Sequence, residues 1–353
     1  MGKHKKRILQ LAFFAATYLA VAALIRAGTI NDFSFAVIVT ICINIILSSS
    51  LNMVTGFAGQ FSLGHAGFMS IGAYVCALTI LRRPTPLGFL LGMLGGALLA
   101  ALVGLLVGLP TLRLRGDYLA IVTIAAAEIV RLIGRSTSMT WLTGGNAGIA
   151  GDGFKNAFHA TCLLPEGDTT VLFWTYSNCY SNSWWLRIVA WVLVALLCLL
   201  VWRLMRSPWG RVLKGIREDE DAVRSLGKSV YSYKMQSLIL GGCMGALGGI
   251  VFVLPQAVQA DSMGRPTTFF VWTLLLLGGA ATVFGPVLGS MLLWSSLMLI
   301  KSVMRDVIPA TVLRTEQIES FSFVVVGVTL MMLIIFRPQG ILGDKKELSI
   351  NVR

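Results

Sequence analysis

The chain has 353 residues, of which 56% are hydrophobic and only 13% are charged. This balance is far from that of a soluble globular domain and indicates a protein that crosses a membrane many times. The formal net charge of +13 would suit a nucleic-acid partner in a soluble protein. Here the Lys and Arg residues stand in short segments beside apolar stretches, where they orient membrane spans, so we expect no nucleic-acid binding.

About ten apolar segments are long enough, alone or tilted, to cross a hydrocarbon core of roughly 30 Å. They lie near residues 8–26, 34–55, 63–81, 87–109, 117–134, 187–205, 235–254, 269–284, 286–304 and 318–336. The expected fold is an all-α, polytopic helical bundle that forms a single membrane domain over 1–353, and an inverted repeat would fit such a bundle. The glycine-rich stretches at 63–81 and around Gly285 fit re-entrant or broken helices as well as full spans.

Most Lys and Arg residues fall on one side of this arrangement. The positive-inside rule places that side in the cytoplasm. It comprises the N-terminal run MGKHKKR, the turn with Arg113 and Arg115, the loop 206–234 and the tail 337–353. Both termini are then inside, and 136–186 is an extracytoplasmic loop. The first span resembles a signal peptide, but Arg26 stands where a small-residue cleavage site is needed, which favours an uncleaved span.

The segment GFAGQFSLGHAGF at 56–68 mixes glycines with polar residues at membrane depth. Non-helical backbone at that depth is tolerated only against protein or along a water-filled path. The segment is therefore a candidate lining of a translocation path, carried by Gly56, Gly59, Gln60, Ser62, Gly64 and His65. A histidine alone is more often a satisfied interior residue than a ligand.

Small residues recur every four positions along two other segments. They are Gly88, Gly92, Gly96, Ala100, Gly104 and Gly108 in one, and Gly241, Gly245 and Gly249 in the other. This spacing lets helix backbones approach closely, so plain helix packing is the favoured interpretation.

Glu128 is an ionisable residue within an apolar span. Arg131 and Arg135 follow at spacings that place all three side chains on one helical face. Ionisable groups inside a membrane usually face a partner or a water path. A structural ion pair between Glu128 and Arg131 is the first interpretation, and a role in the path or its outer gate is the second.

The six cysteines fall into two groups. Cys42, Cys76, Cys198 and Cys243 lie in apolar spans and suit packing. Cys162 and Cys179 share the outer loop, where an oxidising exterior permits a disulfide, although sequence does not give their separation in space.

The loop 206–234 is a charged, amphipathic island between two apolar spans. Its apolar positions, Val212, Leu213, Ile216, Val223 and Leu226, suit a helix that docks in a groove of a partner protein. Gly227 is expected to end that helix in a left-handed conformation. The alternative is a solvated loop without a partner.

Enzyme signatures are absent from the sequence. SLGKS at 225–229 ends like a phosphate-binding loop, but Ala222 occupies the required first glycine position. No HExxH, paired Cys-x-x-Cys or Ser/His/Asp grouping occurs, so we expect no catalytic site, metal or cofactor in this chain.

Six blocks of sequence resemble the permease subunits of ABC importers for branched-chain amino acids, of the LivM type. They are LNMVTGFAGQFSLGHAGFMSIGAY (51–74), LRGDYLAIVTIAAAEIVRL (114–132), LTGGNAGI (142–149), SPWGRVLKGIREDEDAVRSLGKSVYSYK (207–234), GGAATVFGPVLGS (278–290) and FRPQGILG (336–343). The resemblance implies that the charged loop holds a coupling helix that seats on an ATPase subunit. It assigns that role to Gly210, Arg211, Arg217, Glu218, Asp219, Glu220, Ala222 and Gly227, to which Leu226 is added as an apolar contact.

The resemblance also implies location and partners. It suggests a multi-pass protein of the bacterial inner membrane that works with a LivH-like permease, two nucleotide-binding ATPase subunits and an extracytoplasmic binding protein for Leu, Ile or Val. The stretch 150–186 departs from the family pattern as a long aromatic insertion, which leaves open how the binding protein docks. Related permeases that carry urea or short amides stay an alternative. A secondary transporter working alone is disfavoured by the scarcity of intramembrane carboxylates, and a scaffold without transport does not explain the polar segment 56–68.

Overall fold

The computed structural model describes residues 33–112, 116–149, 152–165, 167–171, 174–179, 183–255, 257–307, 317, 321, 324, 327, 328, 331, 335 and 340–343. The first expected span, 8–26, and most of the last, 318–336, lie outside these residues. The N-terminal basic run, the Arg113 and Arg115 turn and most of the tail from Arg337 lie outside them as well.

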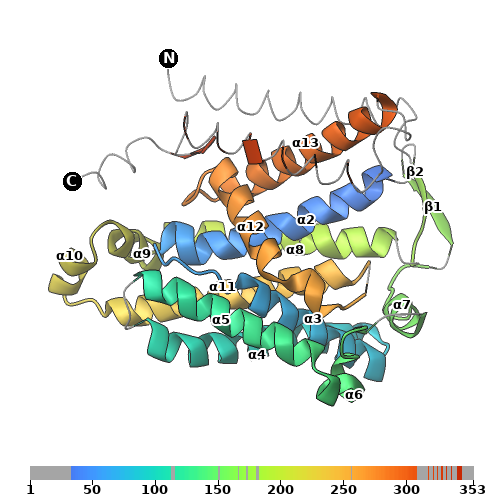
Figure 1. Ribbon diagram of the computed structural model, residues 1–353, viewed down its shortest axis with the longest axis horizontal. Helices are drawn as coiled ribbons and strands as arrows, with labels where there is room; N and C mark the ends of the chain where they lie inside the picture. Colours follow the sequence, from blue (N-terminus) through green and yellow to red (C-terminus); the bar gives the residue numbers. More distant parts are fainter. Residues whose placement is uncertain are drawn as a thin grey trace.

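Long helices form the body of the molecule (Figure 1). They are α2 (Phe33–Leu51) with its π-helical continuation η1 (Asn52–Phe57), α3 (His65–Arg82), α4 (Pro86–Thr111), α5 (Gly116–Arg135), α8 (Trp184–Arg206), α11 (Val230–Val253), α12 (Arg265–Gly278) and α13 (Gly285–Val307). Short helices α9 (Pro208–Glu218) and α10 (Glu220–Ser225) lie at one end. At the other end lie α6 (Thr140–Thr143), α7 (Asp152–His159) and the strands β1 (Asp168–Val171) and β2 (Trp174–Ser177). Two single turns, η2 (Thr137–Met139) and η3 (Ala260–Met263), complete the elements.

Five helices of the described chain are long and apolar enough to cross a membrane. They are Ile38–Phe57, His65–Arg82, Pro86–Thr111, Trp184–Arg206 and Val230–Val253. These confirm five of the expected spans to within a few residues. The count of about ten and the inverted repeat stay predictions.

The expected span at 269–284 is shorter than predicted. Helix α12 ends at Gly278, and an irregular segment runs to the start of α13 at Gly285. Gly279 has φ +108°, and Ala281 has φ +62°, neither of which an α-helix accommodates. Of the alternatives left open around Gly285, the structure has a break between two helices.

The glycine stripes pack helices together, as expected. In the stripe on α4, a Cβ atom on Gly96 would lie 3.2 Å from Cα of Gly72 on α3. On Gly249 of α11 it would lie 2.0 Å from the carbonyl oxygen of Met69. Helices α3 and α11 thus touch through their backbones, which only residues without side chains permit.

The expectation of an all-α chain is wrong in the outer loop. Strands β1 and β2 pair antiparallel there, with Asp168 opposite Ser177 and Val171 opposite Trp174. This stretch is rich in Thr, Val, Trp and Tyr, which favour strands, and lies outside the membrane-spanning segments.

Candidate coupling surface and polar membrane segment

The charged loop 206–234 folds as two helices rather than one. Helix α9 begins at a serine cap, where the Ser207 hydroxyl accepts a hydrogen bond from the Gly210 backbone N–H. It ends at Glu218 because Asp219 is extended, with φ −152° and ψ 103°. The Asp219 carboxylate then caps α10, accepting from the N–H groups of Asp221 and Ala222 at 3.0 and 2.9 Å. Asp219 therefore turns the chain between the two helices.

This break changes which apolar side chains can reach a partner. Leu213 and Ile216 of α9 are 0% and 4% exposed, because they pack inside the chain itself. The prediction that the whole apolar side of 210–227 faces a partner is therefore wrong for α9. Leu226, just after α10, is 77% exposed and points to the outside of the bundle. An exposed leucine amid charges at the end of the molecule is the apolar contact that this loop offers.

Gly227 has φ +75°, and a Cβ atom placed on it would have no atom of the described chain within 4 Å. It follows the last turn of α10, so the prediction that a left-handed glycine ends the helix is confirmed. Arg211, Glu218 and Ala222 lie on the same end of the molecule. Glu220 is held from two sides, by Arg224 at 3.0 Å and by Lys234 of α11.

Gly210 is buried where α9 crosses the end of α8. A Cβ atom there would lie 2.5 Å from the carbonyl oxygen of Leu204 and 2.6 Å from Cα of Met205. Its role is close packing of α9 on α8, and it does not face outward.

Arg217 faces inward, toward the polar segment. Its Nη1 donates a hydrogen bond of 2.9 Å to the carbonyl oxygen of Gly56, the fifth residue of the π-helix η1. A Cβ atom on Gly59 would lie 3.1 Å from Cγ of Arg217, and Gly59 has φ +68°. The glycines thus admit the arginine side chain, which links α9 to the end of the α2 span.

The polar segment lies between η1 and α3 and is non-helical from Gly59 to Gly64, as expected. Its polar side chains are used within the chain. Gln60, 3% exposed, donates to the carbonyl oxygen of Lys234 at 2.8 Å. The hydroxyl of Ser62, 0% exposed, lies 3.5 Å from the Gly64 N–H. Of the segment, Gly59 and Phe61 are the exposed residues.

His65 is the first residue of α3 and is 2% exposed. Its Nε2 lies 2.9 Å from the hydroxyl of Ser50, and that hydroxyl donates to the carbonyl oxygen of Gly241 at 2.7 Å. A Cβ atom on Gly64 would lie 2.9 Å from the carbonyl oxygen of Thr123 on α5. The histidine therefore joins α3 to α2 and α11, but only its Nε2 is satisfied, because Nδ1 is buried without a hydrogen-bond partner among the described residues.

Asn52 is an organising residue that the sequence did not single out. Its side-chain nitrogen donates to the carbonyl oxygen of Thr282, and its oxygen accepts from the Ala281 N–H, both at 2.8 Å. It thereby holds the irregular segment 279–284. Gly56 must be glycine beside it, because a Cβ atom would lie 1.9 Å from the Asn52 side-chain oxygen. The sequence signal that could have identified it is an asparagine within an apolar segment, just before the GFAG run at 56–59.

A π-helical turn such as η1 widens the backbone, and such turns are frequent at functional sites. Here η1 is tied to α9 by Arg217 at one end and to 279–284 by Asn52 at the other. The end of α12, just before the segment 279–284, meets 340–343, where the Ile341 N–H donates to the carbonyl oxygen of Leu277 and the Leu342 N–H to that of Gly278.

A charged cluster lies at the C-terminal end of α5. Arg131 binds both Glu128 and Asp261, so the predicted Glu128–Arg131 ion pair is present. Glu128 also contacts Nε of Arg265 on α12 at 3.4 Å. Arg135 donates to the side chain of Asn146 at 2.7 Å. The cluster joins α5 to η3, α12 and the 145–149 turn.

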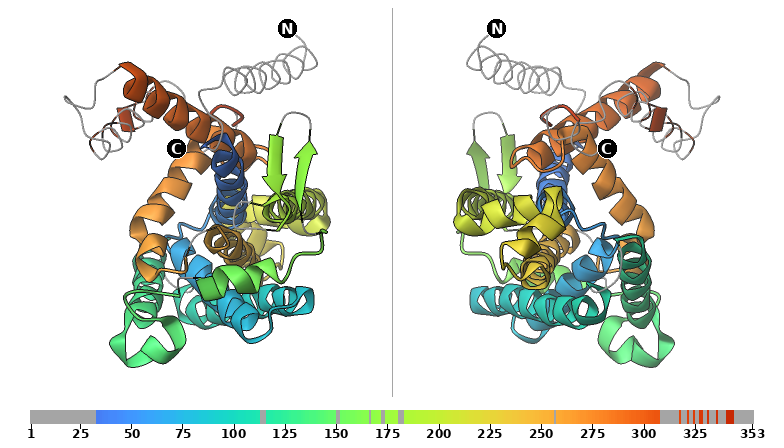
Figure 2. Two further views of the ribbon diagram at one scale, coloured as in Figure 1. Left: turned by 90° about the vertical axis from the view of Figure 1, so that its right-hand side faces the viewer. Right: turned by 90° about the vertical axis from the view of Figure 1, so that its left-hand side faces the viewer.

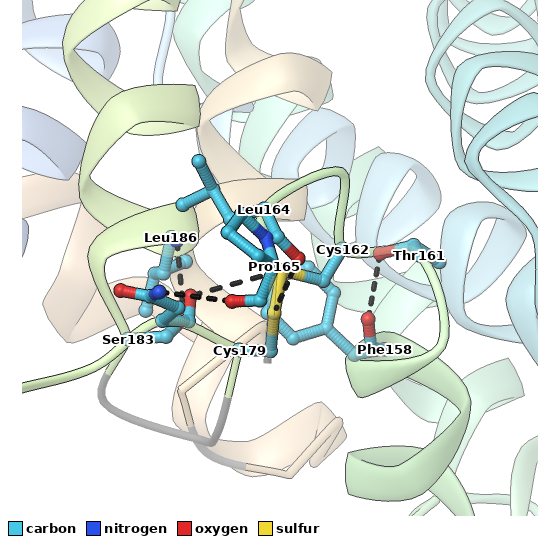
Figure 3. The surroundings of a disulfide bond; sticks show 9 residues. Phe158, Thr161, Cys162, Leu164, Pro165, Cys179, Ser183 and Leu186 are labelled. Carbon is cyan, nitrogen blue, oxygen red and sulfur yellow. Dashed lines mark hydrogen bonds between the residues drawn. A yellow bond between two sulfur atoms is a disulfide. The ribbon is translucent and has the colours of Figure 1, made fainter. Parts of the chain in front are cut away.

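Cys162 and Cys179 form a disulfide in the outer loop (Figure 3). The Cys179 side chain is 5% exposed, and Leu164 lies beside both sulfurs. The bond joins the end of α7 to the end of β2 and so fixes the hairpin on the bundle. Within the residues that the structure describes, no group of three or more His, Cys, Asp or Glu is placed to hold a metal ion.

Membrane-length helices, with two short charged helices at one end and a disulfide-bonded loop at the other, define a multi-pass membrane protein. A family model described as "Branched-chain amino acid transport system / permease component" matches residues 33–335. The chain belongs to this family.

Individual relatives agree with that assignment. The chain is 33% identical over 347 residues to the "High-affinity branched-chain amino acid transport system permease protein LivM" of Escherichia coli (strain K12), covering 94% of this chain and 75% of the relative. It is 26% identical to the "Probable branched-chain amino acid transport permease protein LivM" of Methanocaldococcus jannaschii, covering 67% and 63% of the two chains. Among solved structures, "PsaBC from Streptococcus pneumoniae in complex with Fab" matches with 13% identity and a TM-score of 0.42, over 87% of this chain and 92% of that chain.

Proposed function

We propose that the chain is the LivM-type permease subunit of an ATP-driven importer for leucine, isoleucine and valine. The observation that carries this is the family match over residues 33–335, together with 33% identity to a LivM permease over 94% of the chain. The proposed location is the bacterial inner membrane.

The energy for transport comes from outside the chain in this proposal. The sequence has no complete phosphate-binding loop and no run of intramembrane carboxylates for proton coupling. Two ATPase subunits, which also serve a LivH-like permease, would supply this energy. An extracytoplasmic binding protein would deliver the amino acid. No cofactor is proposed for this chain.

The loop 206–234 is the proposed ATPase contact. Its outer surface presents Leu226 among the exposed residues Asp221, Arg224 and Lys228. An apolar anchor with a charged rim is the usual composition of a protein-binding surface. Helix α9, which packs inside the chain, supports α10 and passes its movement to η1 through Arg217.

The face of α5 and α12 is the proposed contact with the second permease, and the translocation path lies there. Helix α5 is long enough to span but carries Asp117, Glu128, Arg131 and Arg135, which sets it apart from the five apolar spans. A helix with such charges avoids lipid and faces protein or water. The segment 56–65 forms the floor of this path in the proposal, with Gly59 and Phe61 as its exposed residues.

Uptake of labelled leucine into vesicles tests the proposal. The chain, co-expressed with its neighbouring permease, ATPase and binding-protein genes, should take up leucine only when ATP is inside. Excess unlabelled isoleucine or valine should compete, whereas excess urea or acetamide should not. Competition by urea alone would indicate a permease for urea or short amides. Uptake without ATP would support a secondary transporter.

Orientation has a separate test. A reporter fused after Ser225 should report the cytoplasm, and one fused at Asp168 the exterior, because the Lys-rich and Arg-rich loops stay inside. The reverse pattern would overturn both the sidedness and the ATPase contact.

A further inference from the structure

A depression of about 680 Å³ lies on the surface of the molecule along the C-terminal part of α8, up to Ser207. Leu196, Leu199 and Leu200 line its apolar part and are 59%, 55% and 39% exposed. Arg203 and Arg206 line its other end. The spacing of these five residues places them along one face of α8, with the leucines toward the middle of the span and the arginines at its end.

The two arginines place two positive charges in the depression. Both are exposed, and within the described residues no carboxylate lies within ion-pair distance of either one. The Arg206 guanidinium lies 4.0 Å from the ring centroid of Trp202, which holds it against the helix. A tryptophan at this level is typical of the boundary between hydrocarbon and headgroups.

The position of α8 in the bundle argues against a protein on this face. Helix α8 lies on the side of the bundle away from α5 and α12, where the second permease is proposed to pack (Figure 2). Leu226, the proposed ATPase anchor, follows α10 farther along the same end of the molecule (Figure 1). The leucine face of α8 is therefore left to lipid.

We propose that this depression binds an anionic phospholipid of the inner leaflet. The phosphate lies between Arg203 and Arg206, whose planar guanidinium groups match phosphate oxygens, and an acyl chain runs along the three leucines. Because α9 begins at Pro208, a lipid bound here lies at the base of the coupling loop. The proposal rests on the orientation given under Proposed function, which places this end of α8 in the cytoplasm.

Photo-labelling tests the proposal directly. The full chain is placed in phosphatidylcholine nanodiscs that contain a trace of phosphatidylglycerol with a diazirine on its acyl chain, and labelled peptides are identified by mass spectrometry. We expect label on Leu196, Leu199 and Leu200. The double variant Arg203→Gln with Arg206→Gln should lower that label at least about tenfold, since each basic group near the surface contributes to anionic lipid binding. Arg203→Lys with Arg206→Lys keeps both charges but loses the planar guanidinium groups, so its label should lie between that of the unmutated protein and that of the Gln variant.

The matched control is Lys214→Gln with Lys228→Gln, which removes two exposed charges from the same loop without touching the depression. It should keep the label, and a phosphatidylcholine diazirine probe should label all variants equally and weakly. Unchanged labelling in the Arg→Gln variant, or equal labelling by both lipids, would overturn the proposal. Loss of label on adding inorganic phosphate would assign the site to a soluble anion instead. The labelling needs neither ATP nor an amino acid. The lipid proposal can therefore fail while leucine uptake succeeds, and leucine uptake can fail while the labelling succeeds.

Discussion

Arg217 reaches from the charged loop into the membrane domain and donates its 2.9 Å hydrogen bond to the carbonyl oxygen of Gly56. The two residues are separated by 161 positions in the chain. The bond joins the proposed ATPase contact to η1, the widened end of the α2 span, and η1 is held to the irregular segment 279–284 through Asn52. In the proposed function, a movement of α9 would be passed through these two contacts to η1 and to the segment 279–284.

Arg217→Gln should uncouple transport while leaving assembly intact. The glutamine side chain is too short to reach Gly56, so the link from α9 to η1 is lost, and the buried carbonyl loses its charged donor, at about 1.5–3 kcal/mol. We expect normal expression and co-purification of the ATPase, with leucine uptake lowered at least about fivefold. Lys214→Gln, an exposed charge removed from the same helix, is the control and should transport normally. Loss of ATPase co-purification in Arg217→Gln would instead make Arg217 a contact residue.

Leu226→Asp should break the ATPase contact without harming the permease. Leu226 is 77% exposed, so an aspartate there is solvated in the isolated chain. In a complex the same aspartate would be driven against apolar surface, which costs several times the roughly 1 kcal/mol or less of an exposed rim charge. Correct insertion together with lost ATPase co-purification and lost ATP-driven uptake is the expected result.

Two controls sharpen that prediction. Leu226→Ala removes the anchor without adding charge and should weaken co-purification less. Asp221→Lys reverses a rim charge that is 88% exposed and should have a smaller effect still. Normal uptake by Leu226→Asp at normal expression would leave 206–234 as a solvated loop without a docking role.

Structural features set by neighbouring residues were predicted from the sequence. Features set by contacts between distant residues were missed. Gly227 was placed correctly because a glycine after a charged helix commonly adopts a left-handed conformation. The stripe of Gly241, Gly245 and Gly249 was assigned correctly to packing by its spacing. Leu213 and Leu226 looked equivalent in the periodic pattern, yet the break at Asp219 sends one inward and the other outward.

The polar residues of 56–68 show the same limit. Their composition indicated an irregular segment, which the structure has from Gly59 to Gly64. It did not show that Gln60 and His65 would be bound by Lys234 and Ser50, because those partners are set by how α2, α3 and α11 pack. Asn52 was missed for the same reason, since its two partners are about 230 residues away.

The disulfide predicts unequal thiol reactivity in the two single variants. In Cys179→Ser the remaining Cys162 is partly exposed and should label with an external maleimide. In Cys162→Ser the remaining Cys179 is 5% exposed and should label slowly unless the loop opens. Closing a loop of this length stabilises the folded state by about 3 kcal/mol, so either variant should make the outer loop easier to cleave by protease.

The unmutated protein is the control for that experiment. It should label at neither position before reduction and at both positions afterwards. External labelling without reductant would show that the two cysteines do not bridge in the membrane-embedded protein.

Glu128 connects α5 to α12 through Arg265, while Arg131 has a second partner in Asp261. Glu128→Gln should therefore remove the bridge between the two helices but leave Arg131 paired. We expect a loss of stability of about 1 kcal/mol or less, because the pair is partly solvated. Leucine uptake should fall by more than this small loss of stability would explain, since the bridge closes the outer end of the proposed α5 and α12 face.

A charge swap of Glu128 and Arg131 separates this from a simple local ion pair. If the two residues stabilised only each other, the swapped pair would restore function. The structure instead places an arginine at 128 against Arg265 and a glutamate at 131 against Asp261, so the swap creates two like-charge contacts. We expect the swapped protein to transport less than Glu128→Gln alone. Arg135→Gln, which loses Asn146 and a 3.6 Å contact with Asp261 but keeps the α5 to α12 bridge, is the control and should transport near normally. Full rescue by the swap would show that Arg265 and Asp261 take no part, and that Glu128 and Arg131 are a local helix pair.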